Sequence, residues 1–300
     1  MSKEYEPTIL IDPSPERRIL DLRLLGFRDV QVLGRYIYTN AKAPLAIHDH
    51  GEMMEICHLA DGQQAYRVEE EEFFLNGGDI LVNYPHERHG TGLQREGRGT
   101  LYWMIVKPPR SSFLGLSTKE SRQLWASLNP LPRRHFRAKP ETRKLLDKVF
   151  SLWEDQTPPE DIMTGVNVKN YLLRYILDLI EAAGLEPTMS VSREIREAVE
   201  LIKQNDDLFH SMWALAREAG LSESRFKHRF KEEIGISPAD YQLRHKIDRA
   251  CQMLLEGETI LDVASILGFS SSQYFATVFR RYMGIGPVEY RTTNHALRLS

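Results

Sequence analysis

An internal duplication near the end of the chain constrains the fold more than any other feature of the sequence. Residues 213–241 recur as residues 260–290, and the repeat preserves glycines, aromatic residues, a proline and a tyrosine. Early matched positions are 48 residues apart and later ones 49, so one residue has been added near the turn of the second copy. A structural unit is therefore used twice. The matched pairs are Gly220 with Gly268, Ser222 with Ser270, Phe226 with Phe275, Phe230 with Phe279, Gly235 with Gly284, Pro238 with Pro287 and Tyr241 with Tyr290.

Each copy has the pattern of a short helix, a turn and a second helix. Small residues such as Ala216 and Ala264 permit close helix packing, and the glycine after the short helix is suited to a left-handed cap. Ser222, or Ser270 in the second copy, is predicted to cap the next helix. The phenylalanines of that helix are four residues apart, so one edge faces the core and the opposite edge is free to enter a major groove.

The outward edges of these second helices are rich in Ser, Thr, Gln, Lys and Arg, which suit base edges and phosphates. On a single helix such residues usually form a solvated face, but the duplication favours the DNA-binding interpretation. Overall charge does not argue for it, because residues 191–300 hold 15 basic and 15 acidic residues. Ala276 also lies on the outward edge of the second helix, and the predicted DNA-binding residues are Glu223, Ser224, Lys227, His228, Lys231, Ser271, Ser272, Gln273, Thr277, Arg280 and Arg281.

The C-terminal hundred residues resemble the AraC/XylS family of transcription regulators. The second copy carries the resemblance, with its small-residue helix, Gly-Phe turn, Tyr-Phe pair and closing run GIGPVEYR. The resemblance implies two helix-turn-helix subdomains, joined by a long helix from about Ser237 to Leu255, that enter successive major-groove segments of double-stranded DNA. Arg229 stands where the family usually has an apolar residue and His228 where Arg is common, which affects the base contacts expected of the first unit.

The first half of the chain follows a different period. Between about residues 30 and 107, short apolar runs are separated by turn residues such as Asp61-Gly62 and the NGG at 76–78. This pattern is typical of an all-β sandwich or small barrel. Apolar residues then recur at helical spacing, and the resulting helices either dimerise or pack on the β-domain. The predicted helices cover residues 118–128, 140–155 and 162–183.

Length and composition favour two globular domains. No apolar run is long enough to span a membrane, and the first residues lack the apolar segment of a signal peptide. Cys57 and Cys251 are far apart and suit core thiols in a reducing cytoplasm. The predicted organisation is a cupin-like effector-binding barrel over 1–115, a helical segment and candidate dimerisation element over 116–185, a linker at 184–192, and an all-α DNA-binding domain over 193–292.

The β-half contains a candidate site built around histidines. His48 and His50 are followed by Glu55, and a later stretch ends in His89; the two stretches resemble the two cupin motifs. Neighbouring positions two apart in a strand project from the same face. If that face points inward, the four residues form a set of three imidazoles and one carboxylate, which suits Zn, Mn, Fe or Ni. The second motif lacks the glycine of the enzymatic version, which counts against a catalytic metal.

Three interpretations of this site stay open: the lining of an effector pocket, as in sugar-responsive members of the family, a divalent metal centre, or polar groups at a strand end. Aromatic faces and arginine forks suit stacking on, and hydrogen bonding to, a polyhydroxylated ligand. The acidic run 69–72 is interpreted as a solvated hairpin. The predicted pocket residues are His48, His50, Glu55, His89, Arg35, Tyr66 and Trp103, with Tyr36, Arg67 and Tyr84 as further candidates.

These patterns predict a cytoplasmic, sequence-specific transcription regulator, not an enzyme, whose barrel binds a sugar or related metabolite and changes how the DNA-binding units are presented. No cofactor is required, although the barrel is a candidate for a divalent metal. A homodimer and RNA polymerase are expected partners, and a membrane is not. The alternatives are a metal-dependent cupin enzyme with a DNA-binding tail and a DNA-binding protein whose barrel only dimerises. Whether the protein activates or represses is left open by the sequence.

Overall fold

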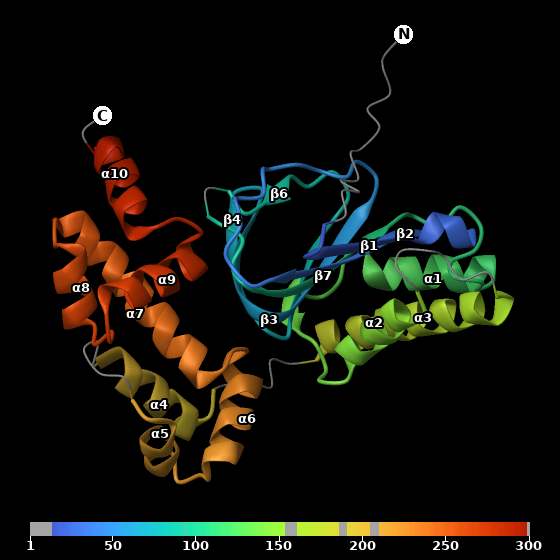
Figure 1. The fold of residues 1–300 in the computed structure, drawn as a ribbon. Coiled ribbons are helices and arrows are strands. Elements are labelled where there is room, and N and C mark those ends of the chain that lie inside the picture. The colour runs from blue at the N-terminus through green and yellow to red at the C-terminus, as the bar shows by residue number, and fades with distance from the viewer. Residues whose placement is uncertain (1–13, 93, 154–160, 186–190, 205–209, 299–300) are drawn as a thin grey trace. The chain divides into compact units, whose positions relative to one another are not determined.

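The structure is a computed structural model that describes residues 14–92, 94–153, 161–185, 191–204 and 210–298. The described residues divide into two compact units, the first mostly before residue 188 and the second mostly after it (Figure 1). Within these ranges, no helix is both long enough and apolar enough to cross a membrane. The predicted linker at 184–192 lies largely outside the described residues, and the predicted domain boundaries stay predictions.

The first unit is rich in β-structure, as predicted. Its described strands pair in the order β1-β2-β7-β3-β5-β8, and β4 and β6 each pair with β3. Strands β1 and β8 are the two ends of this path, so the sheet is open, whereas the sequence predicted a closed cupin-like barrel. The strands are β1 Arg17–Asp21, β2 Val30–Tyr38, β3 Met54–Val68, β4 Glu71–Asn76, β5 Asp79–Asn83, β6 His89–Gly90, β7 Gly99–Val106 and β8 His135–Arg137.

Strand β3 carries most of the pairing and changes partners along its length. Its first half pairs with β5 and β7, and its second half pairs with β4 and β6. The register with β7 shifts between Leu59 and Asp61, and Gly62 has a φ of +110°, which only glycine adopts without strain. The predicted hairpin turn at Asp61-Gly62 is therefore wrong. The irregularity lies at Ala60, just before the dipeptide, and Asp61 and Gly62 continue one long strand by pairing with Thr100 and Gly99 of β7.

The two turns that flank β4 agree with the sequence. The exposed residues Glu69 and Glu70 form a tight connection in which Val68 pairs with Glu71, as expected for a solvated hairpin. The glycines at 77–78 separate β4 from β5, and Gly78 has a φ of +99°. Turn chemistry thus located these loops correctly.

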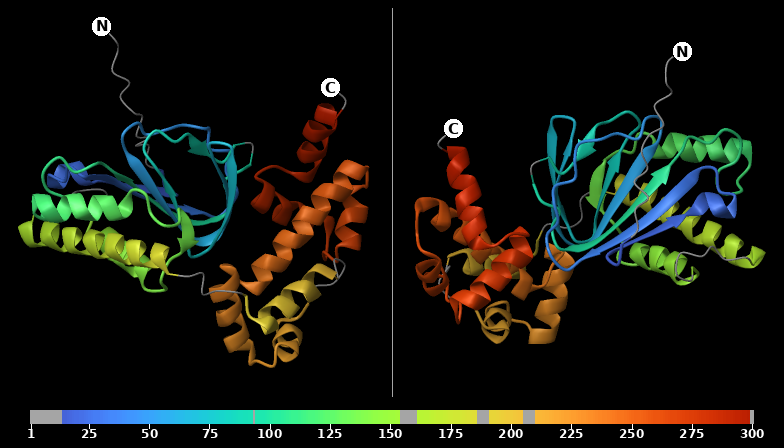
Figure 2. Two further views of the ribbon diagram at one scale, coloured as in Figure 1. Left: turned by 180° about the vertical axis from the view of Figure 1, so that it is seen from behind. Right: turned by 45° about the horizontal axis from the view of Figure 1, so that its top comes forward.

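Two apolar cores lie on opposite faces of the sheet, because alternate residues of a strand point to opposite sides. Ile56 of β3 belongs to the core that packs against helices, and Cys57 belongs to the core within the β-layer. The three helices of this unit run along the sheet in Figures 1 and 2, which confirms the packing interpretation, while their role in dimerisation stays a prediction. They are α1 Thr118–Leu128, α2 Thr142–Ser151 and α3 Ile162–Gly184.

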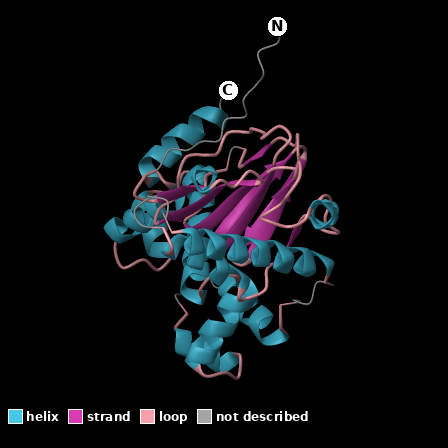
Figure 3. Cartoon of the chain, turned by 90° about the vertical axis from the view of Figure 1, so that its right-hand side faces the viewer, coloured by secondary structure: helices cyan, strands magenta, loops and turns pink. Residues whose placement is uncertain are grey.

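After residue 190 the described secondary structure is all helical, and helices are drawn in cyan in Figure 3. Each copy of the repeat forms a short helix, a turn and a longer helix, with its own buried core built around the paired phenylalanines. The turn glycines have left-handed φ values, +63° at Gly220 and +69° at Gly268. The helices are α4 Arg193–Gln204, α5 Met212–Glu218, α6 Glu223–Ile234, α7 Pro238–Glu256, α8 Ile260–Ile266, α9 Ser272–Met283 and α10 Pro287–Arg298.

The capping serine of the second copy is not the one predicted. Ser222 caps α6 by accepting a hydrogen bond from the backbone N–H of Arg225, but the equivalent bond to Tyr274 is accepted by Ser271, not Ser270. Ser271 is 49 residues after Ser222, so the added residue lies between Gly268 and Ser271. A run of three serines hid this shift in the sequence.

Helix α7 joins the two helix pairs, close to its predicted extent. Two buried polar side chains one turn apart on α7 hold a segment of each pair. The amide of Gln242 exchanges hydrogen bonds with the backbone N–H and C=O of His210, which precedes α5. The ammonium of Lys246 donates a 2.8 Å hydrogen bond to the carbonyl of Leu267, at the end of α8. Both side chains are buried, so α7 connects the two helix pairs through specific polar contacts and not through apolar packing alone.

Candidate functional site

Helix α6 presents all five of its predicted DNA-binding residues to solvent. Glu223, Ser224, Lys227, His228 and Lys231 are all exposed, while the phenylalanines of the same helix are fully buried. Two of these residues are already paired with acidic neighbours: Lys227 with Glu223, and His228 with Glu232 at 3.2 Å. The exposed face of α6 therefore carries ion pairs. These pairs would have to break before Lys227 and His228 could bind phosphate.

Helix α9 has a different charge pattern. It carries Arg280 and Arg281 and no acidic residue, whereas α6 carries four Lys and Arg residues and three glutamates. Gln273, Thr277 and both arginines are exposed, and Ser271, Ser272 and Ala276 are partly buried. The hydroxyl of Thr277 donates to the backbone carbonyl of Gln273 at 3.0 Å. The second helix therefore has the more cationic exposed surface.

The structure adds two candidates that the sequence reasoning missed. Arg225 is exposed on α6, and the Tyr274 side chain is 47% exposed at the start of α9. In the sequence, Tyr274 stands out only as part of the Tyr-Phe pair of the family motif. Its position immediately before the buried Phe275 was the available signal, because adjacent residues of a helix lie about 100° apart.

Arg229 is explained by contacts within the helical unit. Its guanidinium donates to Glu233 on the same helix at 2.7 Å and reaches Glu194 of α4 at 3.4 Å. Glu233 in turn accepts a 2.7 Å hydrogen bond from the backbone N–H of Ser192, and these contacts lower the pKa of its carboxyl even though burial opposes the shift. Arg229 therefore fastens α6 to α4, where the family usually uses an apolar residue.

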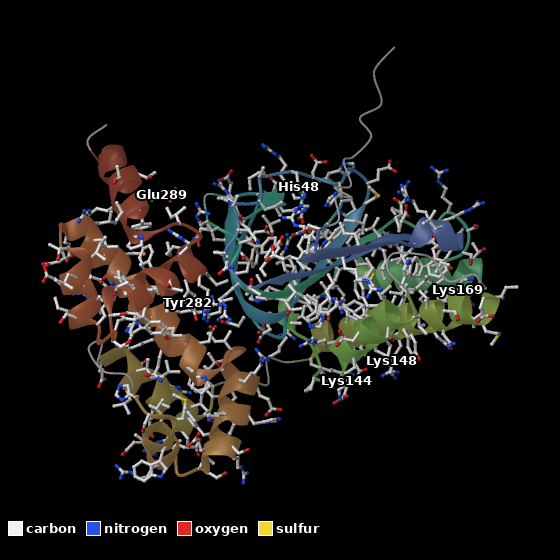
Figure 4. All side chains as sticks on the ribbon, viewed as in Figure 1. His48, Lys144, Lys148, Lys169, Tyr282 and Glu289 are labelled. Carbon is white, nitrogen blue, oxygen red and sulfur yellow. The ribbon has the colours of Figure 1, made fainter. Side chains whose placement is uncertain are left out.

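The histidine cluster of the first unit is held by backbone pairing. His48 and His89 form an isolated antiparallel bridge in which each N–H donates to the other's carbonyl, at 2.9 and 2.8 Å. This pairing brings the two rings together, with centroids 4.6 Å apart. Gly90 lets the backbone at residues 45–46, just before His48, pass close to β6, since a Cβ at Gly90 would lie 2.8 Å from the carbonyl oxygens of Leu45 and Ala46. Figure 4 labels His48 beside β6.

Glu55 and His50 complete the predicted set. Oε2 of Glu55 lies 3.0 Å from Nε2 of His89, and Oε1 lies 3.9 Å from Nε2 of His50. One ligand atom from each of the three histidines lies within 4.8 Å of the others. Asn83, which the sequence reasoning missed, donates from Nδ2 to Glu55 at 3.0 Å. It pairs with Glu55 across β3 and β5, so the parity of those strands was the signal that could have found it.

The protonation of the cluster follows from its burial and its charges. Burial favours the neutral form of Glu55, but the neighbouring imidazoles of His50 and His89 outweigh it and hold the pKa of the carboxyl well below its ordinary value. Burial also opposes protonation of His89, yet Glu55 raises the pKa of this histidine. Burial lowers the pKa of His48. The cluster can therefore hold one negative charge that a nearby cation neutralises.

Three predicted aromatic residues lie together inside the β-layer. Trp103 packs edge-on against Tyr36, with ring centroids 5.8 Å apart, and lies over Gly34, where any side chain would collide with the indole. Tyr66 belongs to the same core and lies near Cys57. The Nε1 of Trp103 is buried without a hydrogen-bond partner among the described residues. These side chains suit an interior ligand-facing role better than a solvent-facing one.

The other predicted pocket residues are not brought to this interior. The guanidinium of Arg35 lies over the ring of Phe150 and 3.9 Å from Asp147 of α2, on the opposite face of the sheet from Trp103. Arg67 is exposed and donates to Glu70 at 2.6 Å. The remaining residue, Tyr84, uses its hydroxyl to accept from the backbone N–H of Leu131. Strand alternation explains Arg35, since Gly34 and Tyr36 on either side of it face Trp103.

Comparison with known proteins agrees with this division. Residues 33–165 match the model of the AraC-like ligand binding domain, and residues 215–293 match that of a helix-turn-helix domain. The arabinose operon regulatory protein of Escherichia coli is 25% identical over 237 residues, which are 77% of this chain and 77% of that protein. The virulence regulon transcriptional activator VirF of Yersinia enterocolitica is 26% identical over 247 residues, 79% of this chain and 89% of the relative.

Solved structures of regulators are also similar. An AraC-type DNA-binding protein from Chromobacterium violaceum is 30% identical and covers 33% of this chain and 89% of its own, with a TM-score of 0.32. ToxT from Vibrio cholerae is 14% identical and covers 93% of this chain and 98% of its own, with a TM-score of 0.34. The two matched family models, together with relatives that are named transcription regulators, identify this chain as a member of the AraC/XylS family, with a ligand-binding domain followed by a helix-turn-helix domain.

Proposed function

We propose that the protein reads a specific DNA sequence through two tandem helix-turn-helix units, with α6 and α9 as their recognition helices. The observation that carries this proposal is the exposed face of α9, which has two arginines and no acidic residue. Such a face attracts phosphates, and Gln273 beside it is suited to a base edge. Because α6 is partly neutralised by its own glutamates, α9 contributes more of the salt-dependent affinity.

The first unit acts in this proposal as the sensor for a small effector, a sugar or a related metabolite. The match to an AraC-like ligand binding domain and the polar groups of the β-interior, Trp103 Nε1 and Asn83 Oδ1, support it. The name of the Escherichia coli relative, which refers to an arabinose operon, favours a sugar. Effector binding controls DNA binding only if the effector has different affinities for the DNA-competent and incompetent states.

Further partners follow from the same proposal. Helix α3 exposes Ile162, Met163, Val166 and Leu177, an apolar surface suited to a homodimer. RNA polymerase and a cytoplasmic location stay predictions that fit a transcription regulator. The metal-dependent enzyme with a DNA-binding tail is not favoured, since the relatives are named regulators.

Selection of bound sites from random DNA with the full chain tests the DNA-reading proposal. We expect one enriched motif, and Gln273→Ala to cost about 1–3 kcal/mol at particular base pairs of that motif. Arg281→Ala should weaken binding to all sequences and reduce the slope of log affinity against log salt by about 1. Lys203→Ala on α4 removes an exposed cation outside both helices and is the matched control. If α9 variants bind like the Lys203→Ala control, the assignment of α9 is wrong.

Repeating the affinity measurement with a panel of sugars and sugar acids tests the sensor. A bound effector should change the affinity for the selected DNA severalfold, and Trp103→Ala should abolish that response while DNA binding without effector persists. Effector-independent DNA binding across the panel would instead support a β-domain that only dimerises.

A further inference from the structure

We propose that His48, His50, His89 and Glu55 bind one divalent transition-metal ion of the zinc type. The ligand atoms of the three histidines lie within 4.8 Å of one another, and the Glu55 carboxylate lies beside two of them. In a tetrahedral site with metal–nitrogen distances of about 2.1 Å, the nitrogens are roughly 3.4 Å apart. Small side-chain rotations, without backbone rearrangement, would bring the cluster to that spacing.

The ring tautomers support the assignment. Nδ1 of His48 lies 2.9 Å from the carbonyl of Ala46, and Nδ1 of His89 lies 2.9 Å from the carbonyl of Glu87. A carbonyl only accepts hydrogen bonds, so each Nδ1 carries the proton and donates it. In a neutral ring this leaves the Nε2 lone pair free to bind a metal. The same arrangement of a backbone carbonyl behind the imidazole orients histidine ligands in metalloproteins.

Groups within the cluster lack partners that a metal would supply. Both ring nitrogens of His50 are buried, and neither has a hydrogen-bond partner among the described residues. The lone pair of His89 Nε2 faces Oε2 of Glu55 at 3.0 Å, so two acceptors meet unless a proton or a cation lies between them. A buried polar group without a partner is costly, and coordination would give one ring nitrogen of each of these two histidines a partner.

The chemistry of the donors selects the class of ion. Imidazole nitrogens suit Zn, Cu, Fe and Ni, whereas Ca²⁺ and Mg²⁺ prefer oxygen ligands throughout. Asn83 holds the carboxylate of Glu55 with a 3.0 Å hydrogen bond, as outer residues commonly do around a metal site. The backbone bridge between His48 and His89 fixes two of the ligands in advance. The competing explanation is a metal-free cluster in which a protonated His89 pairs with Glu55.

Titration of tag-free, chelator-stripped full-length protein with Co²⁺ separates the two explanations. We expect one equivalent to bind with visible d–d absorption of a four- or five-coordinate site, and Zn²⁺ to displace it. His50→Asn and Glu55→Gln should each lower the affinity at least tenfold. His86→Asn is the matched control, because His86 is exposed nearby and is not among the three clustered histidines, and it should bind Co²⁺ like the wild type.

A second measurement needs no variant. Zn²⁺ at a hundredfold excess over its Kd should raise the Tm of the β-rich unit by about 5–10 °C, and a chelator should reverse the shift. Several weak equivalents that persist in both His50→Asn and Glu55→Gln, or no Tm shift with Zn²⁺, would overturn the proposal. These readouts do not involve DNA or a sugar, so a failure here leaves the proposed DNA-binding function standing, and a failure there leaves the metal site standing.

Discussion

Replacing Arg134 by methionine should destabilise the first unit far more than a similar change at a shorter ion pair. The guanidinium of Arg134 donates two hydrogen bonds to the carboxylate of Glu87, at 2.7 and 2.9 Å, and lies over the ring of Tyr84. About a quarter of each partner's side chain is exposed. Arg67 contacts Glu70 at 2.6 Å, but the two side chains are 45% and 90% exposed. Burial and bidentate geometry, not distance, should therefore decide the cost.

The expected magnitudes follow from the contacts. Hydrogen bonds to charged groups contribute about 1.5–3 kcal/mol each when buried, and partial exposure reduces that gain. With about 0.5–1 kcal/mol from the cation–π contact, Arg134→Met should lower the free energy of unfolding by about 2–3 kcal/mol. Arg67→Met breaks an exposed pair and should cost about 0–1 kcal/mol. Methionine keeps the apolar stem in both variants, so the comparison isolates the charged group.

Urea unfolding followed by tryptophan fluorescence measures the difference. Three of the four tryptophans lie within residues 103–153, so the signal reports mainly on the first unit. With a slope of about 2–3 kcal/mol per molar urea, Arg134→Met should lower the midpoint by about 1 M. Arg67→Met is the control for loss of a surface arginine. Equal midpoints for the two variants would refute the reasoning that burial and forked geometry dominate.

Three further predictions concern other parts of the chain. Phe226→Ala and Phe275→Ala remove equivalent, fully buried rings and should each cost the second unit about 3–5 kcal/mol in urea unfolding; strongly unequal costs would contradict the equivalence of the two copies. Gly90→Ala places a Cβ 2.8 Å from two carbonyl oxygens and should lower the Tm of the first unit, whereas an unchanged Tm would mean that the loop yields easily. Burial lowers the pKa of His58 to about 4, so its contribution to stability is intact above pH 6.5 and is lost at about 1.4 kcal/mol per pH unit as the pH falls toward 4. His58→Leu should flatten that acid dependence in unfolding titrations, and an unchanged slope would assign it to another group.

The sequence predicted most of the helical unit because its information there is local and repeated. The duplication located both helix pairs, both glycine turns and the core phenylalanines, and failed only at the capping serine, where three consecutive serines made the added residue impossible to place. The predicted exposed residues of α6 were all found exposed, but their ion pairs depend on rotamers that spacing alone does not specify.

The β-rich unit was harder to predict because its contacts are distant in sequence. The cupin-like spacing did bring four residues together, yet the closed barrel it suggested was not found in the strand pairing. Arg35 was chosen by residue type and lies on the wrong face, although counting alternate residues of β2 from Gly34 would have excluded it. The dipeptide Asp61-Gly62 is compatible with a turn or with an irregular stretch of a continuing strand, and only its pairing with β7 distinguishes them.

The bend of β3 couples the histidine cluster to the shape of the sheet. A straight strand from Glu55 to Val68 would be roughly 40 Å long, at about 3.3 Å per residue. Val68 nevertheless pairs with His89, whose ring lies 3.0 Å from Glu55, so β3 bends and its two ends come close together. The contact between Glu55 and His89 connects these two ends. A change in the backbone separation of Glu55 and His89 would therefore also change the curvature of β3 and would reach the strands that pair with it.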